Sequence, residues 1–276
     1  MNTPTINWES LEFTCVHEAK LLPKPDPQAE EWYKKANELY KAGDKTGDEN
    51  LLHGSFVLML RAAELGHVKA MNNVVVDYLD GDGVKTDESK AVEWAEKLIE
   101  RNIGMGYYHM GVFLEQGIGV KQDRKAALAY FRKAADLGNA QGQLTVGDKI
   151  IAAVARTPDR ERGFAIGTAM LKCSLAQGRS DAGYSLAKHY QIMEKNISLA
   201  LEAFQAAGKL GHRQSLYELR DLFSEGAEKY GLAKDENRAA CYDRLWREVV
   251  ADKTKTFPNL DFICPLPPKP MPRSSI

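Results

Sequence analysis

The segment Gly117–Asp123 (GIGVKQD) decides the fold, because the chain contains it more than once. One copy is Gly81–Asp87 (GDGVKTD), which lies 36 residues earlier, and a looser copy returns at Gly231–Asp235 (GLAKD). A second pair of similar segments, Ala62–His67 (AAELGH) and Ala134–Asn139 (AADLGN), is separated by 72 residues, twice the same step. A fixed step of this size is typical of a stack of structural repeats.

Each copy of the repeat carries a helix-ending residue at the same position. These residues, all of which tolerate left-handed backbone angles, are Gly66, Asn102, Gly138, Gly178 and Gly211. A second set has side-chain oxygens suited to capping the start of a helix, and its members are Asp87, Asp123, Asn196 and Asp235. A third set consists of small residues, as expected where two helices approach closely: Ala70, Gly106, Gly142, Ala182 and Ser215. Each repeat is therefore predicted to contain a helix, a glycine-rich turn and a second, capped helix.

Proline placement indicates that the body of the protein is all-α. Ten of the eleven prolines lie within residues 4–27 and 258–272, and only Pro158 lies between these stretches. Because proline breaks helix interiors, we predict a right-handed α-solenoid of antiparallel helix pairs with extended, proline-rich terminal straps. The predicted parts are an N-terminal extended segment (1–28), the repeat solenoid (29–250) and a C-terminal strap (251–276), with the straps covering the apolar ends of the stack.

The C-terminal run Pro265–Pro270 favours a polyproline II conformation. Three interpretations of this run stay open: a ligand for an SH3-type partner, a strap packed on its own domain, or a loose tail.

Charge and hydropathy exclude two classes of partner. The chain has 37 Lys+Arg and 38 Asp+Glu, a formal net charge of −1, so it lacks the basic field with which proteins bind nucleic acid or anionic lipid. No stretch approaches the roughly 18 apolar residues of a membrane span. We expect no nucleic-acid partner.

Catalytic and metal-binding motifs are missing from the sequence. No HExxH, CxxC, GxSxG or Walker motif occurs. The Gly81–Asp87 turn lacks the spaced oxygen ligands of a calcium loop, and the six histidines are dispersed along the chain. His189, Asp181 and Ser185 stand at helical spacing, but a catalytic triad also needs an exposed nucleophile and an oxyanion hole. We therefore expect no enzyme activity, no cofactor and no metal, and a solenoid of this kind is expected to bind a protein partner.

The four cysteines allow two interpretations. Cys173 and Cys241 fall on predicted helices at small, apolar positions, which favours buried free thiols. Cys15 and Cys264 lie in the two straps. About fourteen extended residues can span roughly 46 Å, so a disulfide between Cys15 and Cys264 could join the straps in an oxidising compartment.

The pattern of Met110–Gly138, with Gly117, Gly119, Tyr130 and Phe131 at fixed places, resembles the Sel1-like repeat, a relative of the tetratricopeptide repeat. The resemblance covers approximately residues 29–250. Two repeats match closely, the outer ones are degraded, and Pro158 marks an insertion.

The terminal segments carry a narrower resemblance. Leu11–Ala19, Gly117–Gly138 and Leu260–Pro268 together resemble a proteobacterial family of Sel1-repeat proteins. Members of that family are exported, often as lipoproteins, and several are similar to the immunity proteins encoded beside lipase effectors of the type VI secretion system, particularly phospholipase D-like ones. The resemblance implies that this chain binds and neutralises such a cognate toxin. The alternative is a scaffold or adaptor that organises protein partners in signalling or envelope assembly.

The resemblance also implies a location. It predicts a periplasmic protein whose export signal or lipid-bearing cysteine lies upstream of this chain, so that it would contact a membrane only through that anchor. The first ten residues do not have the pattern of a signal peptide, which on its own favours the cytoplasm.

A candidate partner surface follows from the repeat register. In tetratricopeptide-like units the first helix of each pair lines the concave face, and one position per repeat points toward it. This position, which we call the tyrosine column, is occupied by Asn72, Tyr108, Leu144, Tyr184 and Tyr217. One helical turn further on, Lys188 and Asp221 would add charge. Either the tyrosines cover the neighbouring repeat, or they form an exposed ladder of aromatic anchors for the partner.

Overall fold

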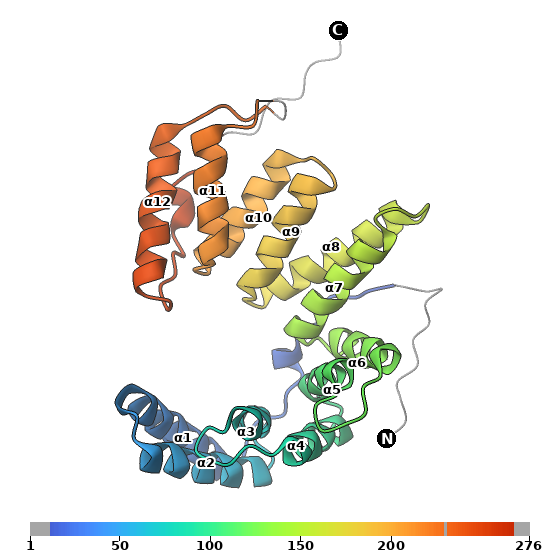
Figure 1. Cartoon of the computed structure of the whole chain (residues 1–276), viewed down its shortest axis with the longest axis vertical. Helices are drawn as coiled ribbons and strands as arrows, with labels where there is room; N and C mark the ends of the chain where they lie inside the picture. The colour runs from blue at the N-terminus through green and yellow to red at the C-terminus, as the bar shows by residue number, and fades with distance from the viewer. Residues whose placement is uncertain (1–11, 229–230, 268–276) are drawn as a thin grey trace. The chain divides into compact units, whose positions relative to one another are not determined.

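The computed structural model describes residues 12–228 and 231–267 (Figure 1). Within these ranges the regular secondary structure is helical, apart from an isolated β-bridge between Ala227 and Leu232, and loops and turns join the helices. The helices are η1 (Glu18–Lys20), α1 (Pro27–Thr46), α2 (Glu49–Glu64), α3 (Val68–Asp80), α4 (Glu88–Glu100), α5 (Gly104–Gln116), α6 (Arg124–Asp136), α7 (Ala140–Val154), α8 (Arg160–Ala176), α9 (Ser180–Ile192), α10 (Ile197–Lys209), α11 (Arg213–Glu225), α12 (Glu236–Ala251) and α13 (Leu260–Ile263). The predicted all-α solenoid of helix pairs is confirmed.

Consecutive helices pack on one another within two compact units, Met1–Val146 and Gly147–Ile276, whose boundary falls inside α7. In the first unit α1 contacts α2, α3 contacts α4, and α5 contacts α6. In the second unit α8 contacts α9, α10 contacts α9 and α11, and α11 contacts α12. No helix in ranges 12–228 and 231–267 has the length and apolar composition of a bilayer-spanning segment.

The helix ends lie where the repeat pattern predicted them. At all four predicted capping positions the side chain accepts hydrogen bonds from the first backbone N–H groups of a helix, and these N-caps are Asp87, Asp123, Asn196 and Asp235. The five predicted helix-ending residues have φ between 56° and 90°. Each repeat is therefore bounded by local backbone chemistry rather than by long-range contacts.

The glycine-rich turn packs against the preceding repeat. Gly83 has φ of 69°, and a Cβ atom placed there would lie 2.2 Å from the carbonyl oxygen of Leu52 on α2. The equivalent Gly119 approaches the carbonyl oxygen of Glu88 on α4, with the corresponding distance 2.8 Å. The second glycine of the motif thus allows the turn to contact the backbone of the preceding helix.

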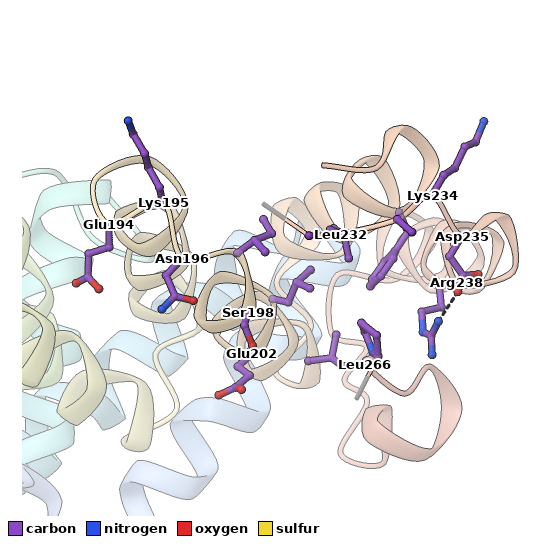
Figure 2. Close-up of a pocket in the computed structure, with 16 residues that line it drawn as sticks. Glu194, Lys195, Asn196, Ser198, Glu202, Leu232, Lys234, Asp235, Arg238 and Leu266 are labelled. Atoms are coloured by element: carbon purple, nitrogen blue, oxygen red, sulfur yellow. Dashed lines mark hydrogen bonds and ion pairs between the residues drawn. The ribbon is translucent and has the colours of Figure 1, made fainter. Parts of the chain in front are cut away.

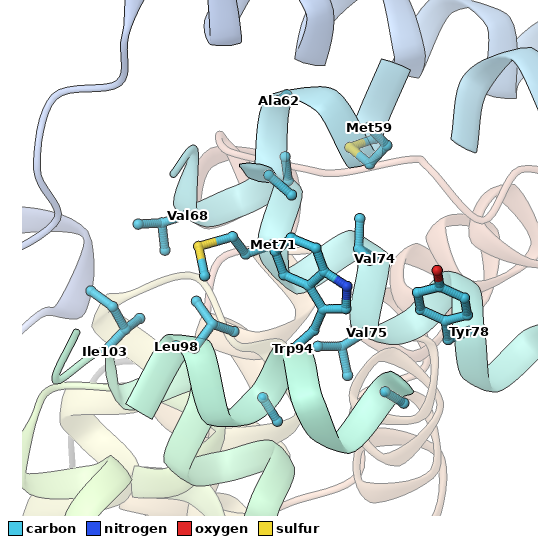
Figure 3. Close-up of a cluster of buried hydrophobic side chains, with 14 of the residues drawn as sticks. Met59, Ala62, Val68, Met71, Val74, Val75, Tyr78, Trp94, Leu98 and Ile103 are labelled. Carbon is cyan, nitrogen blue, oxygen red and sulfur yellow. The ribbon is translucent and has the colours of Figure 1, made fainter. Parts of the chain in front are cut away.

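The core of the first unit is a continuous apolar cluster between α2, α3 and α4 (Figure 3). Val74 is fully buried on α3, and Trp94 and Leu98 pack from α4. Gly106 lies where two helices approach closely and has to be small, because an added Cβ there would lie 2.5 Å from Cβ of Leu98. The other members of the small-residue set are also buried, as the sequence predicted.

The N-terminal strap packs on α5, α6 and the start of α7, which corrects the prediction that it covers the end of the stack. The buried carboxylate of Glu18 accepts hydrogen bonds from the backbone N–H of Met105 and from the side chain of Asn139. The backbone N–H of Glu18 donates to the carbonyl of Gly138. Backbone donors at the start of α5 and the side-chain amide of Asn139 hold the strap at this place. The repeat pattern of the sequence does not predict these contacts.

The C-terminal strap folds back over α10 and α12. The backbone N–H of Phe257 donates to the carbonyl of Lys209 at the end of α10, and α13 follows. Each strap contains one short helix, η1 or α13, which the prediction of extended straps did not include. Residues 265–267 are described, whereas residues 268–270 of the predicted polyproline run and residues 1–11 lie outside the described residues.

Candidate functional site

The residues predicted to bind a partner lie on the first helices of their pairs and are half-buried. They are Asn72 on α3, Tyr108 on α5, Tyr184 and Lys188 on α9, and Tyr217 and Asp221 on α11. Leu144, which shares the tyrosine column, is 7% exposed and belongs to the core. The half-buried members contact the fold and also present atoms to solvent.

In the first unit, Asn72 and Tyr108 each contact a side chain on another helix. His109 Nε2 lies 2.7 Å from Asn72 Oδ1, which joins α5 to α3. The amide nitrogen of Asn72 donates to Asn73 Oδ1, so its oxygen is the acceptor for His109. The ring of Tyr108 packs on Phe131 of α6 with ring centres 5.6 Å apart.

In the second unit, α9 and α11 are joined by a polar cluster around Glu218. The hydroxyl of Tyr184 donates to Glu218 Oε1 over 3.4 Å, and Lys188 Nζ lies 3.3 Å from Glu218 Oε2. The ring of Tyr184 lies beside the ring of His212, with centres 5.1 Å apart. Tyr184 and Lys188 are thus positioned by a carboxylate that the sequence analysis did not select.

A shared rule underlies these contacts. The residue directly after the tyrosine column, His109, Ser185 or Glu218, bonds a side chain on the preceding or following first helix. Ser185 donates to Asp148 Oδ2 on α7 over 3.1 Å, and burial raises the pKa of Asp148. The sequence shows a polar residue directly after the tyrosine column in these repeats. Its role becomes clear only when the structure identifies its hydrogen-bond partner.

Arg220 forms the centre of an aromatic and charged cluster between α11 and α12. Its guanidinium carbon lies 4.0 Å from the ring centre of Tyr217 and 5.4 Å from that of Trp246. Its nitrogens reach carboxylate oxygens of Asp221 at 2.7 Å and Asp243 at 3.4 Å. Asp221 is therefore engaged by Arg220 rather than standing as a separate rim charge. Tyrosine, tryptophan and arginine are the residues most enriched at binding hot spots.

A cleft of about 660 Å³ lies elsewhere in the second unit, and the sequence analysis did not predict it (Figure 2). Its apolar lining includes Leu201 of α10, Phe223 of α11 and Leu232 of the loop before α12. Lys195 and Lys234 at its edge point away from it (Figure 2). Polar and charged residues, including Glu194, Glu202 and Asp235, also line the cleft, so its lining is of mixed polarity.

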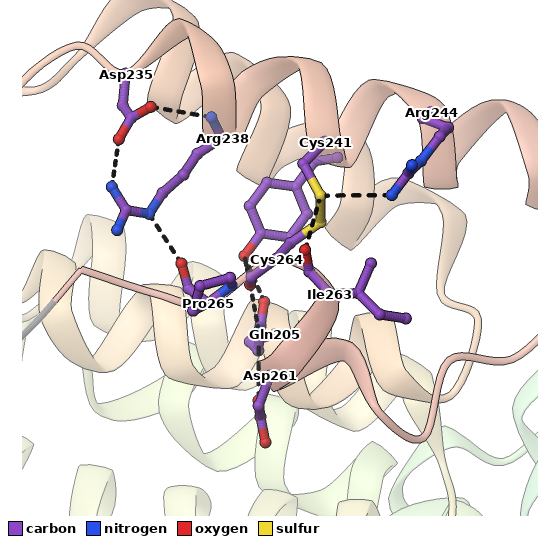
Figure 4. The surroundings of a disulfide bond; sticks show 10 residues. Gln205, Asp235, Arg238, Cys241, Arg244, Asp261, Ile263, Cys264 and Pro265 are labelled. Carbon is purple, nitrogen blue, oxygen red and sulfur yellow. Dashed lines mark hydrogen bonds and ion pairs between the residues drawn. A yellow bond between two sulfur atoms is a disulfide. The ribbon is translucent and has the colours of Figure 1, made fainter.

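The disulfide formed by Cys264 differs from the predicted one. Cys264 is bonded to Cys241 on α12, 23 residues earlier, with Cα atoms 6.0 Å apart (Figure 4). The predicted Cys15–Cys264 bond is therefore wrong, and so is the expectation of free thiols at Cys173 and Cys241, since no cysteine of the chain is free. The error arose because the C-terminal strap was taken as extended, whereas it turns back onto α12.

Two histidines act as helix caps. His67 and His212 precede α3 and α11, and Nδ1 of each accepts a backbone N–H of the first turn. His212 also lies 2.9 Å from Ser215 Oγ and 3.4 Å from Asp181 Oδ1, which superficially resembles a catalytic triad. Because Ser215 has no exposed surface, this arrangement offers no nucleophile to a substrate.

The paired helices and their repeated turns define a helical repeat protein of the solenoid class. The Sel1 repeat family model matches residues 23–41, 69–103 and 104–139. The chain is 25% identical over 122 residues to the mouse protein named Protein sel-1 homolog 2, a match that covers 43% of this chain and only 18% of that protein. The chain belongs to the Sel1-like repeat proteins.

Three solved structures from Pseudomonas aeruginosa resemble the whole chain. PA5086 is 32% identical with a TM-score of 0.68, and the similarity covers 94% of this chain and 96% of that one. Immunity protein Pa5087 is 29% identical with a TM-score of 0.68, over 94% of this chain and 96% of that one. Immunity protein PA5088 is 28% identical with a TM-score of 0.72, over 94% of this chain and 95% of that one.

Proposed function

We propose that this chain is an immunity protein, which binds a cognate antibacterial toxin and blocks it without catalysing a reaction. The observation that carries the proposal is the likeness, over 94% of the chain, to two proteins named as immunity proteins, Pa5087 and PA5088. This likeness extends well beyond the residues that match the Sel1 repeat. A repeat match alone would support a scaffold equally well, because stacked repeats provide binding surfaces in many settings.

The toxin that we propose is a lipase-like effector of the type VI secretion system. The support comes from Leu11–Ala19, Gly117–Gly138 and Leu260–Pro268, which together resemble a proteobacterial family of Sel1-repeat proteins. Several members of that family are similar to immunity proteins encoded beside such effectors. The proposed site of action is the periplasm, where an enzyme that attacks membrane lipid would be met. The disulfide Cys241–Cys264 supports this location, because such bonds persist in oxidising compartments.

The proposed binding surface is the half-buried face of the first helices. In the second unit it includes Tyr184, Lys188 and Tyr217, with Arg220 and Trp246 beside Tyr217. These side chains are already held by neighbouring repeats, so binding would cost little additional side-chain entropy. In the first unit Asn72 and Tyr108 occupy equivalent positions.

The test is protection of a bacterial host. The effector encoded beside the gene for this chain is exported to the periplasm of the host, with or without the exported chain. Restored growth supports the proposal. Purified chain and catalytically inactivated effector are then titrated in a calorimeter, where Tyr217→Ala and Tyr108→Ala should each weaken binding by about 1–3 kcal/mol.

Tyr107→Ala is the matched control. Tyr107 is also half-buried on α5, but it does not belong to the tyrosine column. Its ring lies beside that of Tyr130 on α6. Its replacement should leave binding unchanged. Failure of the wild-type chain to bind or protect would refute immunity and favour the scaffold alternative.

A further inference from the structure

Arg220 links two aromatic side chains that lie on different helices of the second unit. Its guanidinium carbon lies 4.0 Å from the ring centre of Tyr217 on α11 and 5.4 Å from that of Trp246 on α12. The two rings meet edge to face, with their centres 6.0 Å apart. Helices α11 and α12 pack side by side (Figure 1), so one cation contacts a ring on each of two neighbouring helices.

Every nitrogen of the Arg220 guanidinium is hydrogen-bonded to a carboxylate of the chain itself. Nε and Nη2 donate to Asp221 Oδ1 over 2.9 and 2.7 Å, and Nη1 donates to Asp243 Oδ1 over 3.4 Å. Two negative charges therefore balance the positive charge of Arg220 before any partner arrives. An arginine that anchors a partner instead directs its donors at a carboxylate of that partner.

The two rings themselves remain accessible. Tyr217 and Trp246 are half-buried, so each keeps surface that a partner can contact. Because the rings stand on separate helices, rotation of either side chain would change the surface that they form together. A ring that is fixed before association loses less side-chain entropy when the partner binds. The contact of Arg220 with both rings supplies such fixation.

We propose that Arg220 is a positioning residue for toxin binding, which holds Tyr217 and Trp246 as a preformed pair of aromatic anchors and does not itself contact the toxin. This inference rests on the proposed immunity function. Asp221 and Asp243 hold the guanidinium at the two rings, so their role also lies within the chain. The arginine of this cluster thus acts through the aromatic residues.

The test is a double-mutant cycle on binding of the full chain to the catalytically inactivated effector encoded beside its gene. Arg220→Gln should weaken binding by roughly 10-fold in a chain that retains both rings. In the Tyr217→Ala/Trp246→Ala background the same change should weaken binding by less than about 2-fold, because no ring is left to position. Circular dichroism at the assay temperature gives the folded fraction of each variant, which corrects the binding constants.

A second measurement needs no effector. The tryptophan emission of each chain, minus that of its Trp246→Phe counterpart, isolates the signal of Trp246. Arg220→Gln should increase the quenching of this signal by acrylamide, because the guanidinium no longer contacts the ring. Unchanged quenching would show that Trp246 keeps its place without Arg220, which would overturn the proposal.

Arg247→Gln is the matched control. Arg247 Nε donates to Oδ2 of the same Asp243 carboxylate over 2.8 Å, but the Arg247 side chain is 73% exposed. Its replacement should leave toxin binding and Trp246 quenching unchanged. If Arg220→Gln does not fold, Asp243→Asn replaces it in the cycle. That variant removes one carboxylate that holds the guanidinium, so it should cause a smaller loss of binding that also depends on the two rings.

The outcomes separate this inference from the proposed function. If the wild-type chain binds the effector and Arg220→Gln binds equally well, the positioning role is refuted while immunity stands. An equal loss with and without the two rings would show that Arg220 contacts the toxin directly, which also refutes it. Wild-type affinity of Tyr217→Ala/Trp246→Ala would show that the rings are not anchors. If the wild-type chain neither binds nor protects, immunity fails and the positioning role fails with it.

Discussion

His109 Nε2 lies 2.7 Å from Asn72 Oδ1, so a half-buried histidine joins two successive first helices of the first unit. Burial lowers the pKa of His109 to about 4. The imidazole is therefore neutral at physiological pH and donates its Nε2 proton to the amide oxygen. This contact connects the stability of the first unit to pH.

We predict that His109→Gln reduces the loss of unfolding free energy as pH falls from 7 to 4. The folded pKa of about 4 lies below the unfolded value of 6.5, so the unfolded chain takes up the proton first as pH falls. The contribution of neutral His109 is complete above pH 6.5 and is lost as pH falls toward 4. Glutamine keeps an N–H donor but does not titrate, so between pH 7 and pH 4 the variant should lose about 2–3 kcal/mol less unfolding free energy than wild type. Identical slopes in urea titrations would contradict this assignment.

The titration of Asp77 should change stability with pH in the direction opposite to that of His109. Burial, together with the nearby carboxylates of Asp82 and Asp80, raises the pKa of Asp77 to about 7. Because the folded state then holds the proton more tightly than the unfolded state, ionised Asp77 lowers stability as pH rises from about 4 to 7. We predict that Asp77→Asn raises the unfolding free energy at pH 8 by roughly 1–3 kcal/mol, an amount reduced for partial exposure. The gain should disappear near pH 4.

Asp80→Asn is the control for Asp77. Asp80 is exposed and contributes only its charge to the cluster, so its replacement should give less than half of the Asp77→Asn gain. An equal gain would show that repulsion among the carboxylates, rather than burial, dominates. Since His109 and Asp77 oppose each other between pH 4 and 6.5, the wild-type profile should be flatter than that of Asp77→Asn.

The second glycine of the turn motif should be far less replaceable than a helix-ending glycine in open space. Gly83 and Gly47 have nearly equal φ, 69° and 70°. An added Cβ at Gly83 meets the Leu52 carbonyl, whereas nothing lies within 4 Å at Gly47. Gly47→Ala should therefore cost about 1–2 kcal/mol for the left-handed backbone alone. Gly83→Ala should cost at least about 2 kcal/mol more because of the added clash. Equal melting temperatures would show that the turn can move away from α2.

Removal of the disulfide should loosen the C-terminal strap. The bond closes a loop with a sequence separation of 23 residues, so the Cys241→Ser/Cys264→Ser double variant should lose about 3 kcal/mol of unfolding free energy. Limited proteolysis should then cleave between α12 and α13 sooner than in wild type. If the double variant matches wild type in both measurements, the hydrogen bonds that Gln205 and Tyr242 donate to the Cys264 carbonyl are sufficient to hold the strap.

Local signals in the sequence predicted the repeats well. The caps at Asp87 and Asp123 and the left-handed residues at Gly66 and Asn102 follow from backbone chemistry within a few residues, and such chemistry is visible in a single chain.

Contacts between distant segments were not predictable in the same way. The place of Glu18 beside Met105 depends on where a strap without periodicity runs. The pairing of Cys264 with Cys241 depends on the turn after α12. The sequence placed the tyrosine column on the first helices, and whether this face binds a partner stays a prediction. It did not reveal Glu218 or Arg220, which contact Tyr184 and Tyr217.

The hydrogen bonds between successive first helices have a consequence for how the proposed binding surface can change during evolution. Asn72 and His109 are 37 residues apart, and so are Asp148 and Ser185. A substitution that alters recognition at one repeat removes a hydrogen-bond partner from the next repeat. New binding specificity should therefore be acquired through paired substitutions about one repeat apart, and a repeat transplanted alone from a relative would carry only half of each pair.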